Sequence, residues 1–452
     1  MSETSLNVFT MNCWGLKYVS KYRSERVTAI ANELANSPEY DIVALQELWV
    51  YADYELVRAR ISSHLPYAKF FYSGALGAGL AIFSRHPIIG AEIHPYSLNG
   101  EPMDVTGGDW MVGKAAASAI ISHPILGHVQ VINTHLYAKG GEDGPEHKRA
   151  HRLMGSWEFA KIARHAAELG RYVIAVGDFN SIPSTLPITI IRQHADLSDA
   201  WLVAHPFSAS ANPSSTPQEA IDDHGITADS PINSWSSGKN FDVQTRQNFG
   251  KRLDYIFYRQ PKHSSRADGI ASIPTLRCTD CRVMFTHEVG GTTYSHSDHF
   301  GLRATLEIQT PSNPLPSASL PDVEPSFSEA QNAWSTAPAA SSSTPSELSD
   351  AVINTILESL AQASLVSKRR SRKELSIFVM CLIILVAVIV GSPWFPHSWI
   401  SPIFMVFNIF IAWVATTMLY EGFIFGNWEF NAYMNTIEEL ELHQKMLEME
   451  RQ

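Results

Sequence analysis

Cysteine is scarce in this chain, with four among 452 residues. Only Cys278 and Cys281 lie close together, in the stretch CTDC, and a single C-x-x-C without a second pair of cysteines or histidines is a poor match to a zinc site. We expect a loop with free thiols there. So few cysteines fit a reducing compartment, and the start, MSETSLNVFTMNCWG, lacks the charged and apolar regions of a signal peptide.

An excess of basic residues is also missing. The formal net charge is −11, from 34 Lys and Arg against 45 Asp and Glu. Binding to nucleic-acid phosphates needs a basic footprint, so the composition disfavours a dedicated DNA-binding protein, although a local basic groove on an acidic protein is compatible with it. We therefore expect no nucleic-acid partner.

Charged side chains are absent from two long apolar runs near the C-terminus, residues 375–391 and 400–420. A membrane span needs about 20 residues, with a lower limit near 17, and a charge at its centre would cost about 2.5–3.5 kcal/mol. The alternative is two buried core helices, which would need further C-terminal material to cover them. We predict a hairpin of two transmembrane helices, at residues 374–394 and 400–420.

A basic cluster precedes the first predicted span. Its members are Lys368, Arg369, Arg370, Arg372 and Lys373. Because Lys and Arg concentrate on the cytosolic side of membrane spans, we expect an integral membrane protein whose two large ends face the cytosol, in the endoplasmic reticulum or another intracellular membrane. The same cations would attract anionic lipids, at about 1 kcal/mol each near the surface.

Four further segments follow from composition and periodicity. Residues 1–308 alternate strand-like and helix-like stretches and predict one mixed α/β domain. Residues 309–347 are rich in Pro, Ser and Ala and predict a flexible linker. Residues 348–373 combine a short helix with the basic cluster. Residues 427–452 predict a cytosolic amphipathic helix, interpreted either as a solvated cap or as a contact for a partner or an oligomer.

Polar side chains lie at the ends of six apolar runs in the N-terminal domain. They are Asn12, Glu47, His135, Asp178 with Asn180, Asp254, and Asp298 with His299. Each one alone is more often a turn residue or a satisfied buried partner than a catalytic group. Because strand ends meet at one edge of a sheet, the set together predicts a shared site.

The residue types at these strand ends fit one reaction. Carboxylate and amide oxygens without thiolates suit a hard cation such as Mg²⁺. A hard cation beside two histidines suits attack on a phosphodiester, in which the metal neutralises phosphate oxygens, a base activates water and a donor assists the leaving oxygen. The predicted chemistry is metal-assisted hydrolysis of a phosphodiester.

The order of the motifs along residues 7–308 resembles a known family. The matching pieces are MNCWG, ALQELW, GAGLAIFSRHPI, GDWMVGKA, NTHLYA, AHR, GDFNS, RLDYIFY and SDHFGL. They resemble the DNase I-like endonuclease/exonuclease/phosphatase superfamily, and within it the neutral sphingomyelinases and the fungal inositol phosphosphingolipid phospholipases C. The resemblance implies a four-layer α/β sandwich of two mixed sheets flanked by helices, and the C-terminal hairpin also belongs to this subfamily.

The resemblance implies a role for each residue at the strand ends. Glu47 is expected to be the principal metal ligand, with Asn12 close by and Asp298 beside the metal or water. His299 is expected to be the general base and Asp254 its orienting partner. The remaining three positions complete the site: Asp178 and Asn180 position water and phosphate, and His135 donates to the phosphate or the leaving group. The division of roles between Asp178 and His299, and the choice between one metal and two, stay open.

The segment GGDWMVGKAA, residues 107–116, resembles a phosphate-binding loop without matching one. Ala115 follows Lys114 where a nucleotide-binding loop has Ser or Thr, so the hydroxyl ligand for Mg²⁺ is missing and an ATPase is excluded. In the family that the chain resembles, this stretch is linked with activity and with the response to anionic phospholipids. We expect Asp109 and Lys114 to bind the substrate. We also expect anionic phospholipids to activate the enzyme. The alternative is that this stretch only leads into a strand.

A long polar insert separates the motifs DAWLVAHP and KRLDYIF, at residues 207–250. Loops of this length are usually functional or disordered. We expect the part TADSPINSW to lie near the site and assign no role to the rest.

Together these features predict a membrane-anchored, Mg²⁺-dependent phospholipase C. It would hydrolyse inositol phosphosphingolipids or sphingomyelin to ceramide and a phosphorylated head group, with the fungal, inositol type favoured. Two alternatives stay open: a nuclease or inositol-phosphate phosphatase on the same fold, and an inactive membrane scaffold.

Overall fold

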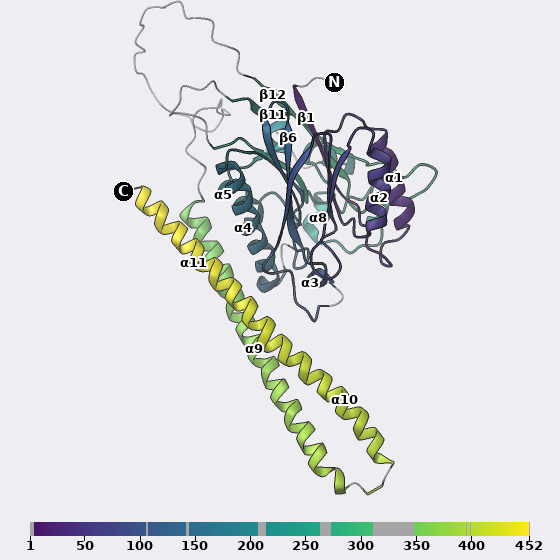
Figure 1. Ribbon diagram of the computed structural model, residues 1–452, viewed down its shortest axis with the longest axis vertical. Coiled ribbons are helices and arrows are strands. Elements are labelled where there is room, and N and C mark those ends of the chain that lie inside the picture. The colour runs from purple at the N-terminus through teal and green to yellow at the C-terminus, as the bar shows by residue number, and fades with distance from the viewer. Residues whose placement is uncertain are drawn as a thin grey trace, which may run out of the picture.

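The computed structural model describes residues 4–104, 107–141, 144–206, 214–262, 273–310, 348–394, 396–397 and 399–451. Two packed β-sheets form the centre of the N-terminal domain, and a pair of long helices extends from one end of it (Figure 1). The predicted linker, apart from its first two residues, lies outside the described residues.

The first sheet is mixed and has the strand order β11-β12-β1-β2-β4-β3. Only the pair β1 and β2 in this sheet is parallel. The strands are β1 (Ser5–Asn12), β2 (Ile42–Gln46), β3 (Tyr67–Phe71), β4 (Leu80–Ser84), β11 (Thr275–Met284) and β12 (Gly301–Gln309).

The second sheet is also mixed and has the order β5-β6-β7-β8-β10-β9, with β7 and β8 parallel. Its strands are β5 (Ile88–Pro95), β6 (Ala115–His123), β7 (Gly127–His135), β8 (Tyr172–Asp178), β9 (Ser198–Asp199) and β10 (Asp254–Arg259). The two sheets are therefore built alike, each with one central parallel pair whose carboxyl ends lie together.

Alternation along the strands explains why the sheets pack face to face. In β1, Leu6 and Val8 enter the core between the sheets, whereas Phe9 and Met11 face the helices outside. Both faces of the central strands are buried. β8 is accordingly apolar in most positions, whereas β1 also carries polar residues, of which Thr10 and Asn12 are buried. Side chains that alternate across a strand thus supply two cores from one segment.

Helices cover the outer faces of both sheets (Figure 1). The first sheet carries α1 (Arg23–Ala35) and α2 (Tyr51–Ile61), and the second carries α4 (Glu146–Glu168) and α5 (Leu186–His194). This is the DNase I-like four-layer sandwich that the sequence predicts. Shorter helices lie in the connections: α3 (Asp109–Val112), α6 (Ala200–Ala204), α7 (Pro217–His224), η2 (Ser234–Ser236) and α8 (Val243–Gln247).

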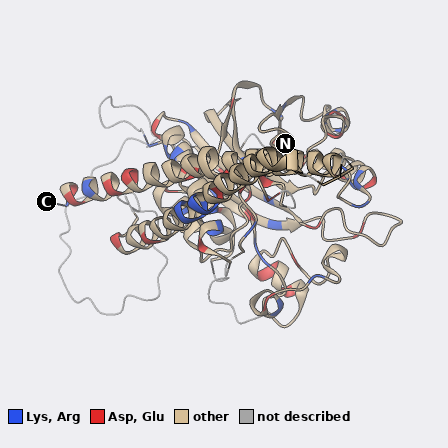
Figure 2. Cartoon of the chain, turned by 90° about the horizontal axis from the view of Figure 1, so that it is seen from below, with Lys and Arg blue, Asp and Glu red and all other residues tan. Residues whose placement is uncertain are grey.

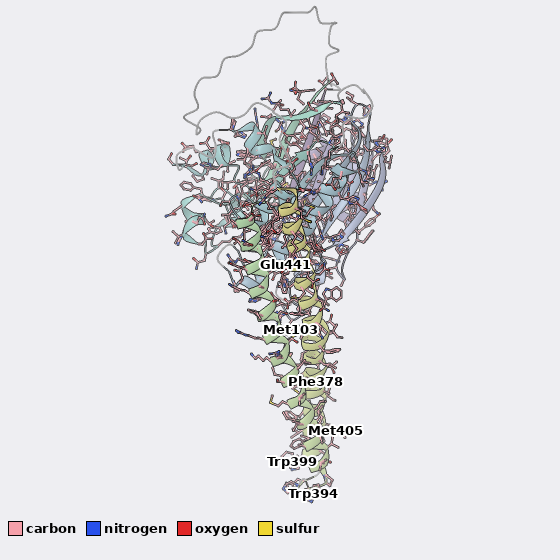
Figure 3. All side chains as sticks on the ribbon, turned by 90° about the vertical axis from the view of Figure 1, so that its left-hand side faces the viewer. Met103, Phe378, Trp394, Trp399, Met405 and Glu441 are labelled. Carbon is pink, nitrogen blue, oxygen red and sulfur yellow. The ribbon has the colours of Figure 1, made fainter. Side chains whose placement is uncertain are left out.

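The C-terminal part forms a helical hairpin. Helix α9 (Asp350–Gly391) runs without a break through the predicted juxtamembrane helix, the basic cluster and the first predicted span. After η3 (Ser392–Trp394), α10 (Ile400–Leu419) returns alongside α9, and a π-helical stretch, η4 (Tyr420–Phe425), leads into α11 (Gly426–Glu450). In Figure 3 the hairpin extends away from the domain past Phe378 and Met405 to Trp394 at its tip.

The hairpin has two parts with different surroundings. Near the domain, α11 packs on α9 and on α4, and Tyr433 and Leu440 are buried in the core that includes the outer face of the second sheet. The tail helix is therefore docked and is not a solvated cap. Farther out both helices are long and apolar enough to cross a membrane, and their apolar side chains are exposed, 65% for Ile383 and 71% for Ile409.

Charge follows the same division. Residues 375–420 contain no Asp, Glu, Lys or Arg, and the view along the molecule from the hairpin end shows the basic cluster gathered on α9 (Figure 2). A soluble protein rarely exposes so large an apolar surface. The exposed surface indicates membrane association and counts against two buried core helices.

The stretch CTDC differs from its expected structure. Cys278 and Cys281 lie within strand β11, where the register shifts between Cys278 and Asp280, and not in a loop. Both thiols are free and buried in the core between the sheets. The bulge explains the miss, because it places two residues that are three apart on the same inner face.

Candidate active site

Strand register brings three of the predicted site residues into one row. His135 is the last residue of β7 and pairs with Asp178 at the end of β8, while Asp178 pairs in turn with Asp254 at the start of β10. From the facing sheet, Asn12 ends β1 and Glu47 directly follows β2. Five separate stretches of sequence thus converge at one end of the sandwich.

Two of these residues have unusual backbone conformations. Glu47 has φ of 53° and Asn180 has φ of 47°, a left-handed region that side chains other than Gly rarely adopt. Glu47 directly follows the buried strand β2, and Asn180 lies two residues after the end of β8. Such local strain concentrates at functional sites, where the surrounding structure offsets its cost.

Asn12 joins the two sheets at the site. Its amide nitrogen donates to Oε1 of Glu47 at 3.1 Å and to Oδ2 of Asp178 at 3.0 Å. Its amide oxygen accepts the backbone N–H of Trp14 at 3.0 Å, which fixes the orientation of the amide. Asn12 therefore holds two carboxylates from different sheets beside each other.

A histidine and an aspartate form a buried pair next to these carboxylates. Nδ1 of His299 lies 2.8 Å from Oδ2 of Asp254, and Nε2 of His299 lies 3.8 Å from Oδ2 of Asp178. Burial lowers the pKa of His299, but the charges of Asp254 and Asp178 oppose this and raise it well above the usual value. The hydrogen bond at Nδ1 leaves Nε2 as the nitrogen facing the site.

A lysine supplies positive charge at the other side. Nζ of Lys114 lies 3.0 Å from Nε2 of His135, donates to the carbonyl of Leu136 at 2.8 Å and lies 3.1 Å from Oδ1 of Asp109. Burial, followed by the charge of Lys114, holds the pKa of His135 well below its usual value. His135 is therefore neutral, and Lys114 is the cation that can face a phosphate here.

The carboxylates are poorly compensated as they stand. Burial, followed by the charge of Asp298, raises the pKa of Glu47 to about 7, and burial raises that of Asp178 to about 6. Oxygens or nitrogens of Asp178, Asp254 and His299 lie within 4.8 Å of one another. Among the described residues Glu47 accepts a hydrogen bond only at Oε1, so its other oxygen can take a cation. The residues fit a hard divalent ion.

The two remaining predicted residues lie at the edges of this group. Asn180 receives its position from Asp178, whose Oδ1 accepts the Asn180 backbone N–H at 2.9 Å, and its side chain donates to the carbonyl of Leu136. Asp298 is partly exposed, and its Oδ2 lies 3.8 Å from Nζ of Lys239. All ten predicted residues therefore lie in the cluster or directly beside it.

Two residues that support the cluster were not singled out by the sequence analysis. The hydroxyl oxygen of Thr227 accepts the backbone N–H groups of Leu253 and Asp254, and the hydroxyl of Ser297 donates to the carbonyl of Asn12 at 2.7 Å. Thr227 lies in the stretch TADSPINSW, which was expected near the site. Ser297 belongs to the motif SDHFGL and could have been found there.

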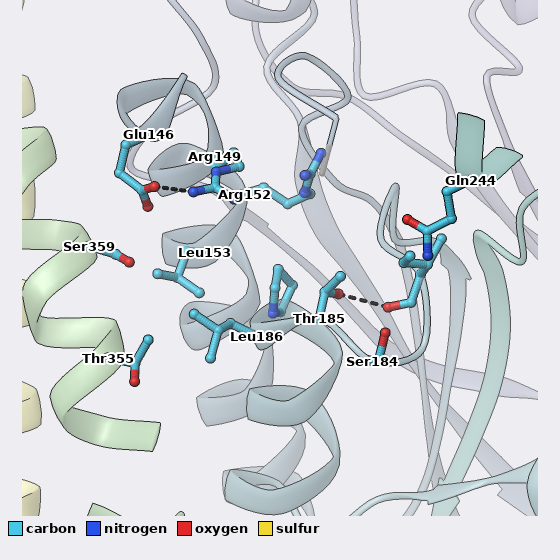
Figure 4. Close-up of a pocket in the computed structure, with 12 residues that line it drawn as sticks. Glu146, Arg149, Arg152, Leu153, Ser184, Thr185, Leu186, Gln244, Thr355 and Ser359 are labelled. Carbon is cyan, nitrogen blue, oxygen red and sulfur yellow. Dashed lines mark hydrogen bonds and ion pairs between the residues drawn. The ribbon is translucent and has the colours of Figure 1, made fainter. Parts of the chain in front are cut away.

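A separate cavity of about 450 Å³ lies between α4, the segment after β8 and α9 (Figure 4). Its arginines are engaged: Arg149 pairs with Glu146, and Arg152 donates to backbone carbonyls that include that of Gly141. Among the ten residues of the cluster described above, none lines this cavity. It is distinct from the candidate active site.

The fold and the convergent acids, amides and histidines define a hydrolase of the DNase I-like class. The pattern of the Endonuclease/Exonuclease/phosphatase family matches residues 9–273. The inositol phosphosphingolipids phospholipase C of Schizosaccharomyces pombe is 33% identical over 447 residues, which cover 98% of this chain and 95% of that protein. Sphingomyelin phosphodiesterase 2 of Homo sapiens is 32% identical over 255 residues, 56% of each chain.

Solved structures include sphingomyelinase C from Streptomyces griseocarneus, with 18% identity, coverage of 67% of this chain and 99% of that chain, and a TM-score of 0.44. The chain belongs to the endonuclease/exonuclease/phosphatase family, which is metal-dependent. Within it the chain is a phosphodiester hydrolase of the sphingomyelinase and inositol phosphosphingolipid phospholipase C type.

Proposed function

We propose that this protein is a membrane-anchored, Mg²⁺-dependent phospholipase C that hydrolyses phosphosphingolipids to ceramide and a phosphorylated head group. The observation that carries the proposal is the contact of Asn12 with both Glu47 and Asp178, beside the His299–Asp254 pair. It gathers ligands for a hard cation and a base within one site. Among phosphosphingolipids we favour those with an inositol phosphate head group.

The preference for inositol phosphosphingolipids is supported by how much of this chain aligns with each relative. The fission-yeast relative named for that substrate aligns over 98% of this chain, including the hairpin, whereas the human sphingomyelin phosphodiesterase aligns over 56%. In both substrates the bond that breaks joins phosphorus to the ceramide oxygen, and the head group is released as a phosphate monoester. The site chemistry is therefore common to both, and the preference concerns the head group alone.

The ion would be held by Glu47, with Asn12 orienting that carboxylate and Asp298 beside it. When bound, Mg²⁺ supplies a positive charge for the non-bridging oxygens of the phosphate. Among the remaining site residues, Lys114, held by Asp109, adds a second positive charge, and His135 and Asn180 bind phosphate oxygens. These groups stabilise charge that increases in the transition state.

Proton transfer is assigned to His299. Its raised pKa means that the ring must first lose a proton, which the positive charge of a bound ion would favour. Nε2 of the neutral ring then accepts a proton from water, while Asp254 holds Nδ1 and keeps the ring in the required tautomer. Asp178, between His299 and Asn12, orients the water. The water oxygen forms a bond to phosphorus, the bond from phosphorus to the ceramide oxygen breaks, and that oxygen takes up a proton to leave as ceramide.

The hairpin places this chemistry at a bilayer. We propose that α9 and α10 span an intracellular membrane such as the endoplasmic reticulum, with the catalytic domain, residues 1–308, on the cytosolic side. Anchoring raises the effective concentration of a lipid substrate. Anionic phospholipids are proposed as activators through the basic cluster on α9, and the outer hairpin surface is a possible oligomer contact.

The test uses purified full-length protein with mixed sphingolipid vesicles, with and without Mg²⁺, and mass spectrometry of the products. We expect ceramide and a phosphorylated head group only with Mg²⁺, and loss of turnover in Glu47→Ala and His299→Ala with folding retained. His128→Ala, at the exposed start of β7, is the matched control and should keep full activity.

Three results would contradict the proposal. Retained activity in either site variant would remove that residue from the mechanism. Faster cleavage of abasic DNA than of sphingolipid would favour a nuclease. An inert wild type that still binds vesicles would favour a scaffold.

A further inference from the structure

A cavity of about 330 Å³ lies where the catalytic domain meets the end of the membrane hairpin. Three elements line it: the loop at residues 73–75, the region from Pro95 to helix α3, and the helical turns η4 and α11. Its walls are mostly apolar and aromatic, including Tyr96, Trp110, Met111, Phe425 and Trp428. A lining of this kind takes a hydrocarbon ligand more readily than a charged one.

The cavity exists because the hairpin is docked on the domain. Nε1 of Trp428 donates to the carbonyl of Ser97 at 3.1 Å, and the rings of Trp110 and Tyr420 meet edge to face at 6.4 Å between centroids. Both contacts cross from the domain to the segment that directly follows α10. One wall of the cavity is thus a continuation of the proposed membrane span.

The opposite wall adjoins segments that carry residues of the candidate active site. Helix α3 ends at Val112, and Gly113, which lines the cavity, is followed in the chain by Lys114. The hydroxyl of Tyr96 is hydrogen-bonded to that of Thr134 at 2.6 Å, one residue before His135. Through Gly113 and Tyr96 the cavity therefore adjoins the chain segments that carry Lys114 and His135.

Close backbone packing holds this wall in place. Gly74 and Gly113 both have positive φ, and a Cβ on Gly113 would lie 2.6 Å from the Cα of Gly74. The carbonyl of Met111 accepts the backbone N–H groups of Ala75 and Leu76. The loop and α3 thus form one rigid unit.

The cavity is at the level of the expected membrane surface. In Figure 1, α3 lies at the end of the domain from which the hairpin extends, and in Figure 3 Met103 lies between Glu441 and Phe378 along the long axis. Leu76 and Met103 are exposed apolar residues on the loops beside the cavity. A lipid chain could enter from the bilayer without crossing water.

We propose that this cavity holds one hydrocarbon chain of the phosphosphingolipid substrate while the phosphate occupies the adjacent site. The inference rests on the proposed function and adds to it a site for the lipid part of the substrate. Burying the chain beside the spans lets the head group rise to the catalytic residues while the rest of the lipid stays in an apolar environment. The enzyme would then select long-chain substrates through this cavity.

The test fills the cavity by substitution and measures how turnover depends on the chain length of the substrate. Ala75→Trp and Ser97→Phe place bulk at two separate walls, and Ala59→Trp on the exposed face of α2 is the matched control. With full-length protein in vesicles, we expect each filling variant to lower turnover of a long-chain sphingolipid about tenfold or more, because the chain loses its apolar site. Of two analogues, one shortened in the N-acyl chain and one in the sphingoid chain, the one that lacks the chain held in the cavity should stay within about twofold of its wild-type rate. The control should change none of these rates.

Photolabelling gives a readout independent of turnover. Sphingolipid probes with a diazirine near the end of either chain should label the cavity residues in wild type, and the filling variants should lose this labelling. Equal labelling by a diacyl phospholipid probe, no cavity labelling, or an equal loss of turnover for the long-chain substrate and for both shortened analogues would overturn the inference. If wild type cleaves no phosphosphingolipid, the proposed function fails, and the labelling alone decides whether the cavity holds the lipid.

Discussion

Replacing Asp254 with Asn tests the proposed base most directly. The carboxylate of Asp254 is fully buried and accepts the hydrogen bond from Nδ1 of His299 at 2.8 Å. Asn keeps the shape and removes the charge. Its amide can also donate to Nδ1, and this would move the imidazole proton to Nε2, the nitrogen that must accept a proton from water.

The size of the effect follows from that hydrogen bond. A hydrogen bond to a charged group contributes about 1.5–3 kcal/mol. Since about 1.36 kcal/mol corresponds to a tenfold change in rate, loss of the bond alone lowers kcat about 10- to 150-fold. The wrong tautomer would increase the loss beyond this range, whereas KM should change little because Asp254 does not contact the phosphate.

The pH profile separates this role from a purely structural one. Burial lowers the pKa of His299, while Asp254 and Asp178 raise it. Without the charge of Asp254 the pKa falls, so the acid limb of kcat/KM should move to lower pH while the plateau drops. The assay is kcat/KM against pH at saturating Mg²⁺, with the exposed Asp222→Asn as control.

Two outcomes would refute the assignment of His299 as the base. One is a plateau for Asp254→Asn within about threefold of wild type, which is less than the smallest loss expected for one charged hydrogen bond. The other is a reduced plateau with an acid limb at unchanged pH. The charge of Asp254 raises the pKa of Asp178 as well as that of His299, so the second result would exclude both residues as the group that sets the acid limb.

Two further predictions follow from the buried charges. The raised pKa of Glu47, about 7, means that protons compete with the ion below neutral pH. The affinity for Mg²⁺ should therefore fall about tenfold per pH unit below that value. Calorimetric titration with Mg²⁺ at several pH values measures this, and a pH-independent affinity would contradict it. Glu429 is 1% exposed and is bound to His151 and Arg370. Its change to Gln should lower the free energy of unfolding by about 3–5 kcal/mol, because it breaks a buried ion pair. A lower Tm in detergent than that of the exposed Glu441→Gln would confirm this, and equal Tm values would refute it.

Much of the fold could be predicted from periodicity. The apolar runs that contain β1, β2, β4, β6, β7, β8, β10 and β12, and the helical spacing in α1 and α4, match the structure. Strands β3, β5, β9 and β11 were missed. All four lie at sheet edges, β3 and β11 in the first sheet and β5 and β9 in the second. Exposed polar residues interrupt the apolar pattern in β3, β5 and β11, and β9 has only two residues.

Most of the site residues could be found because they lie at one end of a buried strand or directly beside it, where a polar residue is unexpected. The contacts among them could not. That Asn12 binds both Glu47 and Asp178 depends on how the two sheets face each other, and that Lys114 binds His135 depends on the turn after α3. Such long-range geometry leaves no local trace in composition or spacing.

The docking of the hairpin changes what the linker implies. Sequence alone suggests a domain that hangs from its anchor on a flexible segment. In the structure α9 and α11 pack on α4, and the buried Glu429 joins His151 of the domain to Arg370 of the basic cluster. Arg370 also pairs with Glu101, on the loop that leads to Asp109 and Lys114. One of the five cations expected to attract lipid is thus used inside the protein, and the same ion cluster fixes the hairpin against the catalytic domain.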